Sequence, residues 1–205
     1  MKSNANPLHA LYCLTPKKTS VTFYACSLVP LDSPADLIMS KSLRDSFPER
    51  IASLAARVAG SPLDEELARM LNERFGAGSP EYEGLAESCR AGVAEGWMCQ
   101  REHGGIRYGR VLKASSGTCG FSVDVVDMAD VAGPHHIHPN GEIDLVMPLA
   151  EGDGLVPGGG AAFDGQGAGW KVYGPGSAHR PTVSGGRALV LYLLPQGAIE
   201  FTSRA

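Results

Sequence analysis

The spacing of apolar residues along the chain changes near Gly96. Before this residue, apolar side chains recur every three to four positions, which is typical of amphipathic helices that cover a core with one face. The segment 61–76, SPLDEELARMLNERFG, follows this pattern throughout. Three short amphipathic helices are therefore predicted within residues 43–95, and their apolar stripes are interpreted as core.

Local start and stop signals place the ends of these helices. Ser61 is predicted to cap the second helix, because a serine oxygen accepts from the free amide groups of a first turn, and Pro62 would occupy its first position. Gly76 marks the end of that helix. Ser79 and Pro80 repeat the same opening for the third helix. No residue of this helical segment carries a functional prediction.

After Gly96 the apolar period shortens toward two, which is typical of strands that bury one face. The predicted strands are separated by glycine, proline, asparagine and aspartate, and they read GIRYGRVLKA, GFSVDVVDM, EIDLVMPL, GWKVYGP and RALVLYLLP. Several short strands with tight turns indicate a sandwich or a small barrel. The predicted class is therefore mainly β, preceded by a short α-helical segment.

Residues 1–38 share neither pattern. The apolar stretch VTFYACSLVPL follows two lysines, as the core of a signal peptide would, but it starts late and no clear small-residue cleavage site follows it. Met39 opens a segment that looks more like a natural start. The predicted organisation is a weakly structured extension over 1–38, a helical segment over 39–96 and a β-barrel over 97–205.

Composition narrows the range of functions. The chain has 205 residues, 18 basic and 22 acidic, with a net charge of −4, and no basic run is longer than two residues. Neither nucleic acid nor an anionic membrane surface is expected as a partner. No apolar run reaches the roughly 18–20 residues of a membrane span. The five cysteines are odd in number and form no Cys-x-x-Cys pair, which favours reduced thiols and a cytoplasmic location.

Candidate chemistry is concentrated in the stretch from Gly133 to Asp144, GPHHIHPNGEID. In an extended chain, side chains two positions apart lie on the same face. His136 and His138 therefore share one face, while His135 lies on the opposite one. His135 is interpreted as a packed residue or as a support for a ligand, rather than as a ligand itself.

A tight turn follows these histidines. Asn140 and Gly141 form the dipeptide that is favoured in two-residue β-hairpins. A hairpin at this point would bring Glu142 back toward the two histidines. Asp144 would share the face of Glu142, where it could orient a histidine, carry a proton or cap a turn.

His179 is the fourth candidate ligand. It follows YGPGSA, whose Pro-Gly turn could set it at the start of a strand. Its distance along the chain is no obstacle, because neighbouring strands of a barrel need not be consecutive. Imidazoles and a carboxylate that converge on one face suit Fe, Mn, Zn, Co or Ni. The predicted ligands of this divalent metal are His136, His138, Glu142 and His179.

These residues resemble the two sequence motifs of the cupins. The first motif, His-x-His followed by Glu, reads HIHPNGE here. The second begins at Gly169, continues with Pro175 and Gly176 and ends at His179, and Pro175 lies one place closer to Gly169 than in the usual form. The resemblance covers about 105–200. It implies a cupin-type double-stranded β-barrel, or jelly roll, with the metal at its mouth and the four candidate residues at the ligand positions.

Three longer segments are similar to a smaller cupin-like family that includes 4-hydroxylaminobenzoate lyase. They read EGWMCQREHGGIRYGRV, SVDVVDMADVAGPHHIHPNGEIDLVMP and FDGQGAGWKVYGPGSAHRPTV, within a match that spans about 42–202. This resemblance implies a lyase that converts 4-hydroxylaminobenzoate to 3,4-dihydroxybenzoate (protocatechuate) and ammonia in nitroaromatic degradation. The reaction involves no net oxidation, so it requires no redox cofactor.

The implied reaction gives several residues an expected role. The metal would act as a Lewis acid on the hydroxylamino oxygen, before water attacks the adjacent ring carbon and the resulting imine is hydrolysed. The predicted catalytic residues are Glu142, chiefly as a ligand, Asp144, as a proton relay, and Tyr173, as a source of a hydroxyl group. The substrate carboxylate needs a cation. The candidates are Arg180, Lys171 and either Arg107 or Arg110.

The same residues are compatible with other functions. An Fe(II) cupin dioxygenase acting on a small aromatic compound or a thiol would use the same ligands and consume oxygen. A non-catalytic cupin that binds a small ligand would use the helical segment for docking or dimerisation. Sugar isomerisation or epimerisation is a weaker alternative. A homodimer is expected because exposed edge strands need cover, and the expected partner in solution is a small aromatic carboxylic acid.

Overall fold

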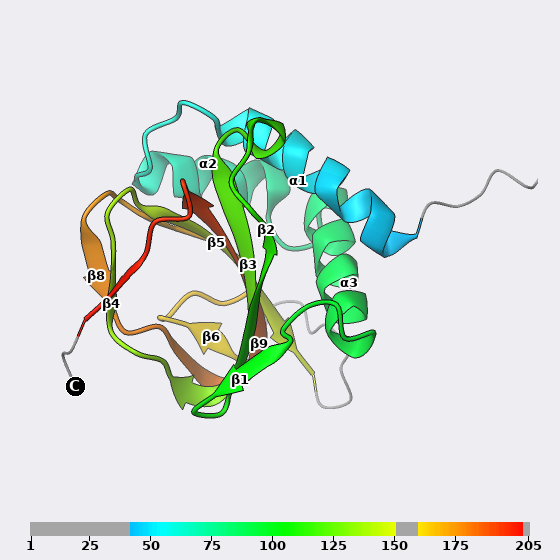
Figure 1. The fold of residues 1–205 in the computed structure, drawn as a ribbon, viewed down its shortest axis with the longest axis vertical. Coiled ribbons are helices and arrows are strands. Elements are labelled where there is room, and N and C mark those ends of the chain that lie inside the picture. Colours follow the sequence, from blue (N-terminus) through cyan, green and yellow to red (C-terminus); the bar gives the residue numbers. More distant parts are fainter. Residues whose placement is uncertain (1–41, 151–159, 203–205) are drawn as a thin grey trace, which may run out of the picture. The chain divides into compact units, whose positions relative to one another are not determined.

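The computed structural model describes residues 42–150 and 160–202. The extension predicted over 1–38 lies outside the described residues and stays a prediction. Residues Ser40–Ala205 form one compact unit, and the described helices and strands all belong to it (Figure 1). None of the described helices is both long and apolar enough to cross a bilayer.

The three predicted helices are present before the first strand. Their bounds are α1 Leu43–Val58, α2 Glu65–Phe75 and α3 Pro80–Ala94. The third helix begins as predicted, because the side chain of Ser79 accepts from the backbone N–H of Tyr82 at 3.1 Å and Pro80 follows it. The second helix ends at Phe75, next to Gly76, as predicted.

The predicted start of α2 is wrong. Its cap is Asp64, whose Oδ1 accepts from the backbone N–H of Leu67 at 3.0 Å, and not Ser61. A carboxylate suits the positive end of a helix dipole better than a hydroxyl group does. The later start also leaves Leu63 outside the helix, where its side chain packs against the backbone at Gly141. The entry to α2 therefore contacts the turn that carries a candidate ligand.

Most strands join one seven-stranded sheet, in the order β1-β2-β3-β9-β5-β7, and β6 adds to β9. Their bounds are β1 Arg101–His103, β2 Ile106–Leu112, β3 Phe121–Ala132, β5 Glu142–Leu149, β6 Ala162–Phe163, β7 Gly169–Tyr173 and β9 Thr182–Pro195. A 3-10 turn, Ser116–Thr118, lies between β2 and β3. All of the strand pairs in this sheet are antiparallel.

A second, three-stranded sheet has the order β10-β4-β8. Its strands are β4 His136–His138, β8 Ser177–His179 and β10 Glu200–Phe201. In Figure 1 the helices cover one side of the large sheet, and the small sheet lies on the other side. The described residues thus form three layers, with the two sheets facing each other.

Alternation along β5 shows how the sequence builds these layers. Ile143, Leu145 and Met147 belong to the apolar cluster that the helices share with the large sheet. Val146, on the opposite face of the strand, belongs to the apolar cluster between the two sheets. Glu142 and Asp144 lie two and four positions before Val146, so they share this inner face. The alternation expected from the sequence is therefore confirmed for β5, and the acids on its inner face are buried.

The predicted hairpin at Asn140 and Gly141 is wrong. The strand before the turn, β4, pairs with β8 and β10, whereas the strand after it, β5, pairs with β7 and β9. Both edges of β5 are thus occupied, so the chain passes from one sheet to the other at this turn. The turn still closes locally, since the N–H of Gly141 donates to the carbonyl of His138 at 3.1 Å.

Candidate metal centre

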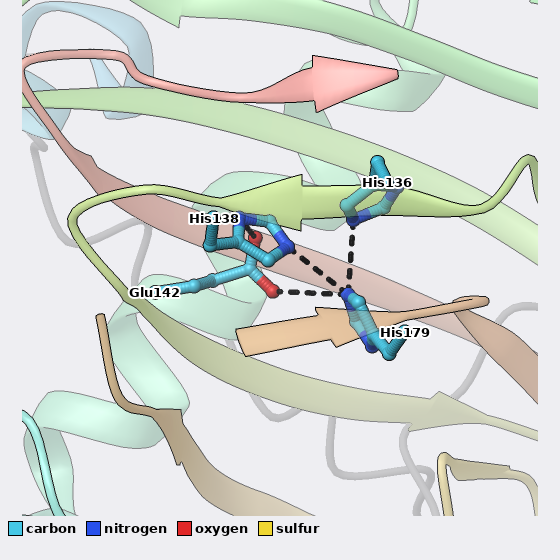
Figure 2. A group of neighbouring side chains, drawn as sticks. All are labelled: His136, His138, Glu142 and His179. Carbon is cyan, nitrogen blue, oxygen red and sulfur yellow. Dashed lines mark hydrogen bonds and ion pairs between the residues drawn. The ribbon is translucent and has the colours of Figure 1, made fainter. Parts of the chain in front are cut away.

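Four side chains from both sheets converge between them. His136 and His138 come from β4, His179 from β8 and Glu142 from the start of β5. One ligand atom from each residue lies within 4.8 Å of the others, and Figure 2 shows the four side chains pointing toward one another. The structure therefore brings together the four residues that the sequence singled out.

Strand register explains the meeting of the histidines. His136 pairs directly with His179 across β4 and β8, and His138 is two positions farther along β4 on the same face. The Nε2 atom of His179 lies 2.9 Å from Nε2 of His136 and 3.1 Å from Nε2 of His138. Three ring nitrogens thus meet at one point.

Glu142 reaches this point because the turn before it is very tight. Gly141 has a φ of +82°, and a Cβ added there would lie 2.6 Å from the carbonyl oxygen of Tyr173. The close backbone approach places Oε2 of Glu142 at 3.1 Å from Nδ1 of His138, and Oε1 at 3.7 Å from Nε2 of His179. Glycine is required here for both its conformation and its lack of a side chain.

Hydrogen bonds at the far side of two rings decide where their protons lie. Nδ1 of His136 donates to the carbonyl oxygen of Pro134 at 3.1 Å, and Nδ1 of His179 donates to the Asp164 carboxylate at 2.6 Å. A neutral imidazole carries one proton, so the Nε2 atoms of both rings present lone pairs to the centre of the cluster.

Burial keeps His136 and His138 neutral. Burial lowers the pKa of His136 to about 4, and the nearby His179 adds to this effect. Burial, with the neighbouring imidazoles, lowers the pKa of His138 to about 3. Neutral imidazoles are the form that binds metal ions.

The acids of the cluster are equally buried. Glu142 and Asp144 are 1% and 0% exposed, and none of their carboxyl oxygens makes a hydrogen bond within the described residues. Burial raises the pKa of both groups well above its usual range, and the adjacent carboxyl raises that of Glu142 further. A buried carboxylate without a donor is costly unless a cation or a proton neutralises it.

The donor set therefore fits a divalent metal ion. Imidazole lone pairs that face one another at about 3 Å repel unless a cation lies between them, and the unbonded oxygens of Glu142 provide an anionic ligand. A set of three nitrogens and a carboxylate is compatible with Fe, Mn, Zn, Co or Ni. The cluster can hold a metal, and its geometry leaves the choice among these ions open.

The other predicted site residues lie at different distances from this centre. His135 is not part of the cluster, since its Nδ1 bonds to Oγ1 of Thr202 at 2.7 Å. Asp144 is buried on the same face as Glu142. Tyr173 pairs with Glu142 across β5 and β7, and its hydroxyl donates to Asp164 at 2.6 Å. The catalytic roles of Asp144, Glu142 and Tyr173 stay predictions.

The three cations chosen for the substrate carboxylate do not line the cavity that reaches the metal centre. Arg107 lies 3.5 Å from Asp127, and neither residue lines that cavity. Lys171 donates to the backbone carbonyl of Asp164 at 2.9 Å. Arg180 is exposed, directly after His179. Their role in substrate binding stays a prediction.

A cavity of about 910 Å³ opens beside the cluster, and His136 and Glu142 form part of its wall. Apolar and aromatic side chains line most of it, including Ile106, Val126, Met128, Tyr192, Leu194 and Phe201. Its cationic lining residues are Arg101, Arg110 and Lys113. Arg110 donates to Asp124 through Nε at 2.8 Å and Nη2 at 2.9 Å. Of the four cations considered from the sequence, Arg110 is the one that faces this space.

Asp164 is a site residue that sequence reasoning missed. It follows β6 in the segment FDGQ and contacts His179 from a position fifteen residues away. An Asp-Gly pair is a common turn signal, but nothing in the spacing of Asp164 connects it with a histidine. The contact exists because β6 pairs with the start of β9, just after His179.

Two facing sheets with three histidines and a glutamate between them define this chain as a cupin-type protein. A family model described as 4-hydroxylaminobenzoate lyase (PnbB) matches residues 49–201. The chain is 32% identical over 175 residues to a 4-hydroxylaminobenzoate lyase from Pseudomonas putida, covering 79% of this chain and 97% of that protein. It is 35% identical over 176 residues to one from Nocardioides sp. (strain LMS-CY), covering 83% and 96%.

The chain therefore belongs to the 4-hydroxylaminobenzoate lyase family. This confirms both the resemblance found in the sequence and the interpretation of the chain as an enzyme of the lyase class. The residues that match the family model, 49–201, include the strands, the helices α2 and α3, and all four residues of the cluster.

Two solved structures are similar at lower identity. An oxalate oxidase is 24% identical with a TM-score of 0.34, covering 49% of this chain and 57% of that one. An RmlC-like cupin protein from Ralstonia eutropha JMP134 is 11% identical with a TM-score of 0.36, covering 49% and 61%. The predicted class, mainly β and cupin-type with a helical segment in front, is confirmed, although the two sheets are not joined into a closed barrel.

Proposed function

We propose that this chain is a metal-dependent lyase that converts 4-hydroxylaminobenzoate and water to 3,4-dihydroxybenzoate and ammonia. The observation that carries the proposal is the buried cluster of three histidines and Glu142 beside a cavity, in a member of this lyase family. The two relatives named above carry the name of this activity.

The proposed reaction balances without an external oxidant. The N–O bond breaks with its electron pair leaving on oxygen, while water forms a bond to the adjacent ring carbon. A second water adds to the resulting C=N group, ammonia leaves, and the ring regains its aromaticity by losing a proton from carbon. The nitrogen is reduced as the ring carbon is oxidised, and the net uptake is one water. A divalent metal held by the cluster would supply Lewis-acid assistance to the N–O cleavage.

The inner face of the large sheet offers a path for the substrate. Arg110, Asp124, Tyr192 and Asp144 are consecutive partners across β2, β3, β9 and β5. Strands lie about 4.8 Å apart, so the two ends of this row are separated by about 14 Å. A benzoate ring placed over the row would have the metal centre near one end and a cation near the other. Arg110 is therefore the cation that we favour for the substrate carboxylate, because its counterparts Arg107, Lys171 and Arg180 do not line the cavity.

Asp144 keeps its proposed role as a proton relay, whereas Tyr173 is given a positioning role in place of a catalytic one. Asp144 does not line the cavity, whereas Glu142 does. A proton held by Asp144 would therefore reach the substrate through Glu142. Tyr173 donates to Asp164 instead of pointing into the cavity. Its contribution is to fix the residues that surround the metal, which lets the cluster stay ordered when substrate and product exchange.

The test uses the full chain loaded with each candidate metal and a chelated sample as reference. Dihydroxybenzoate and ammonia are followed after addition of 4-hydroxylaminobenzoate, with dissolved oxygen recorded in the same vessel. We expect equal amounts of both products without oxygen uptake. The matched variants are His136→Ala, which removes a ligand, and His135→Ala, which removes the neighbouring imidazole that lies outside the cluster. The first should lose turnover, and the second should keep most of it.

Two outcomes would overturn the proposal. One is the absence of both products with every loaded metal. The other is oxygen uptake in proportion to product, which would assign the same cluster to a dioxygenase.

A further inference from the structure

We propose that Asp164 is a positioning residue that sets the tautomer of His179 and thereby makes its Nε2 atom a metal ligand. The inference rests on the metal centre of the proposed function. The residue pair is Asp164 and His179, whose Oδ2 and Nδ1 atoms lie 2.6 Å apart.

The carboxylate of Asp164 is held from several sides. Oδ2 accepts from Nδ1 of His179 and from the hydroxyl of Tyr173, both at 2.6 Å. Oδ1 accepts from the backbone N–H of Thr182 at 2.7 Å. The backbone carbonyl of Asp164 accepts from Nζ of Lys171 at 2.9 Å. Groups from β7, β8 and β9 thus fix the orientation of one acid.

Two other donors already point at the carboxylate of Asp164, the Tyr173 hydroxyl at Oδ2 and the Thr182 backbone N–H at Oδ1. A carboxylate can only accept, so Nδ1 of His179 must carry the ring proton. The lone pair is then left on Nε2, which lies 2.9 Å from Nε2 of His136 at the centre of the cluster.

His179 is the most exposed of the three histidines, so its orientation depends most on the contact at its far nitrogen. Nδ1 of His136 is fixed by a backbone carbonyl, and Nδ1 of His138 lies against Glu142. The short strand β8 presents His179 with 11% of its side chain exposed, against 0% for His138. Carboxylates that bind the far nitrogen of a ligand histidine fix its orientation and raise its basicity. Asp164 has the geometry for both effects.

The substitution Asp164→Asn removes the charge of the side chain and should change the tautomer of His179, while it keeps the shape of the side chain. Asp164 has a φ of +44°, a conformation that asparagine also tolerates. The amide oxygen would be kept by the Thr182 N–H, so the NH₂ group would face His179 and Tyr173. Nδ1 of His179 would then have to accept, and the ring proton would move to Nε2, where it points at the metal position. The ligand is lost although the side chains keep their places.

The experiment reads the tautomer and the metal affinity separately, in the full chain. Nitrogen chemical shifts of ¹⁵N-labelled imidazoles report the tautomer in metal-free protein, and competition with a chromophoric chelator reports the affinity for Zn²⁺. In the wild type we expect His179 to be protonated at Nδ1. In Asp164→Asn we expect protonation at Nε2 and an affinity lower by about 10–100-fold. Co²⁺ spectra should show a changed ligand field at the same time.

Two control variants distinguish positioning from simple loss of stability. Tyr173→Phe removes the other donor to the same oxygen but leaves the His179 contact, so His179 should stay protonated at Nδ1 and the Zn²⁺ affinity should fall less than in Asp164→Asn. Asp127→Asn removes a buried carboxylate that pairs with Arg187 outside the cavity. It should lower stability without changing the tautomer or the affinity.

Failure of the role proposed for Asp164 can be distinguished from failure of the proposed metal centre. An unchanged tautomer in Asp164→Asn, or a Zn²⁺ affinity equal to that of the wild type, would overturn the role of Asp164 alone. A wild type that binds none of the candidate metals would overturn the metal centre and, with it, the purpose assigned to this contact, even where the tautomer shifts as expected.

Discussion

Replacing Gly141 by alanine should destabilise the protein and displace Glu142, a candidate metal ligand, whereas the same change at Gly176 should cost much less. The two glycines have φ values of +82° and +78°, and both donate their N–H to the carbonyl of His138. The backbone conformation alone therefore costs each alanine variant about 1–2 kcal/mol. Their surroundings differ. A Cβ at Gly141 would lie 2.6 Å from the carbonyl oxygen of Tyr173, whereas one at Gly176 would meet nothing within 4 Å.

The expected difference between the two variants is the cost of the forced contact. Overpacking of this kind costs a further 1–3 kcal/mol, so Gly141→Ala should lose about 2–5 kcal/mol in all. Urea unfolding of metal-free protein, followed by circular dichroism and tryptophan fluorescence, measures both values. Gly141→Ala should also bind metal more weakly, because the backbone shift that relieves the contact moves Glu142. Equal losses of stability in the two variants would refute this reasoning, since only the shared conformational cost would then be present.

Three further predictions concern the fold, the substrate and the metal. Trp170→Phe should lower the free energy of unfolding by about 1–3 kcal/mol in urea titration, because it leaves the buried carbonyl of Phe75 without the indole donor at 2.7 Å. Arg110→Met should raise KM for the carboxylated substrate by about tenfold or more in steady-state assays, as loss of a charged hydrogen bond does. Arg107 does not line the cavity, so Arg107→Met should leave KM near the wild-type value. Equal increases in KM from the two substitutions would contradict the assignment of Arg110 to the substrate carboxylate. Chelation should lower Tm, since metal at about 100 times its Kd stabilises by about 2.7 kcal/mol. A Tm that does not depend on metal concentration would count against the site.

Local patterns indicated which residues would meet in the cluster, because a period of two along an extended chain carries geometric information. The shared face of His136 and His138 followed from their spacing, and the strand read as EIDLVMPL corresponds to β5 residue for residue. The helical segment was equally visible in its apolar period and in the cap at Ser79. Each of these features depends on residues that are close in sequence.

The errors came where partners are distant in sequence. Asn140 and Gly141 indicated a reversal correctly, but which strands would flank it depended on β7, β9 and β8, which pair from other parts of the chain. The connection between Asp164 and His179 likewise arises from the pairing of β6 with β9. Arg107 and Arg110 could not be told apart, because a strand's two faces are chemically similar until its neighbours are known. The homodimer and the cytoplasmic location stay predictions.

The four cluster residues are divided three to one between the two sheets. His136, His138 and His179 belong to the three-stranded sheet, Glu142 belongs to the large one, and no strand pairs across the two sheets among the described residues. An ion held by all four would therefore act as a cross-link between two layers. The frequency with which the small sheet opens would fall as the metal concentration rises. Amide hydrogen exchange in β4 and β8 would then measure occupancy of the site even in the absence of substrate.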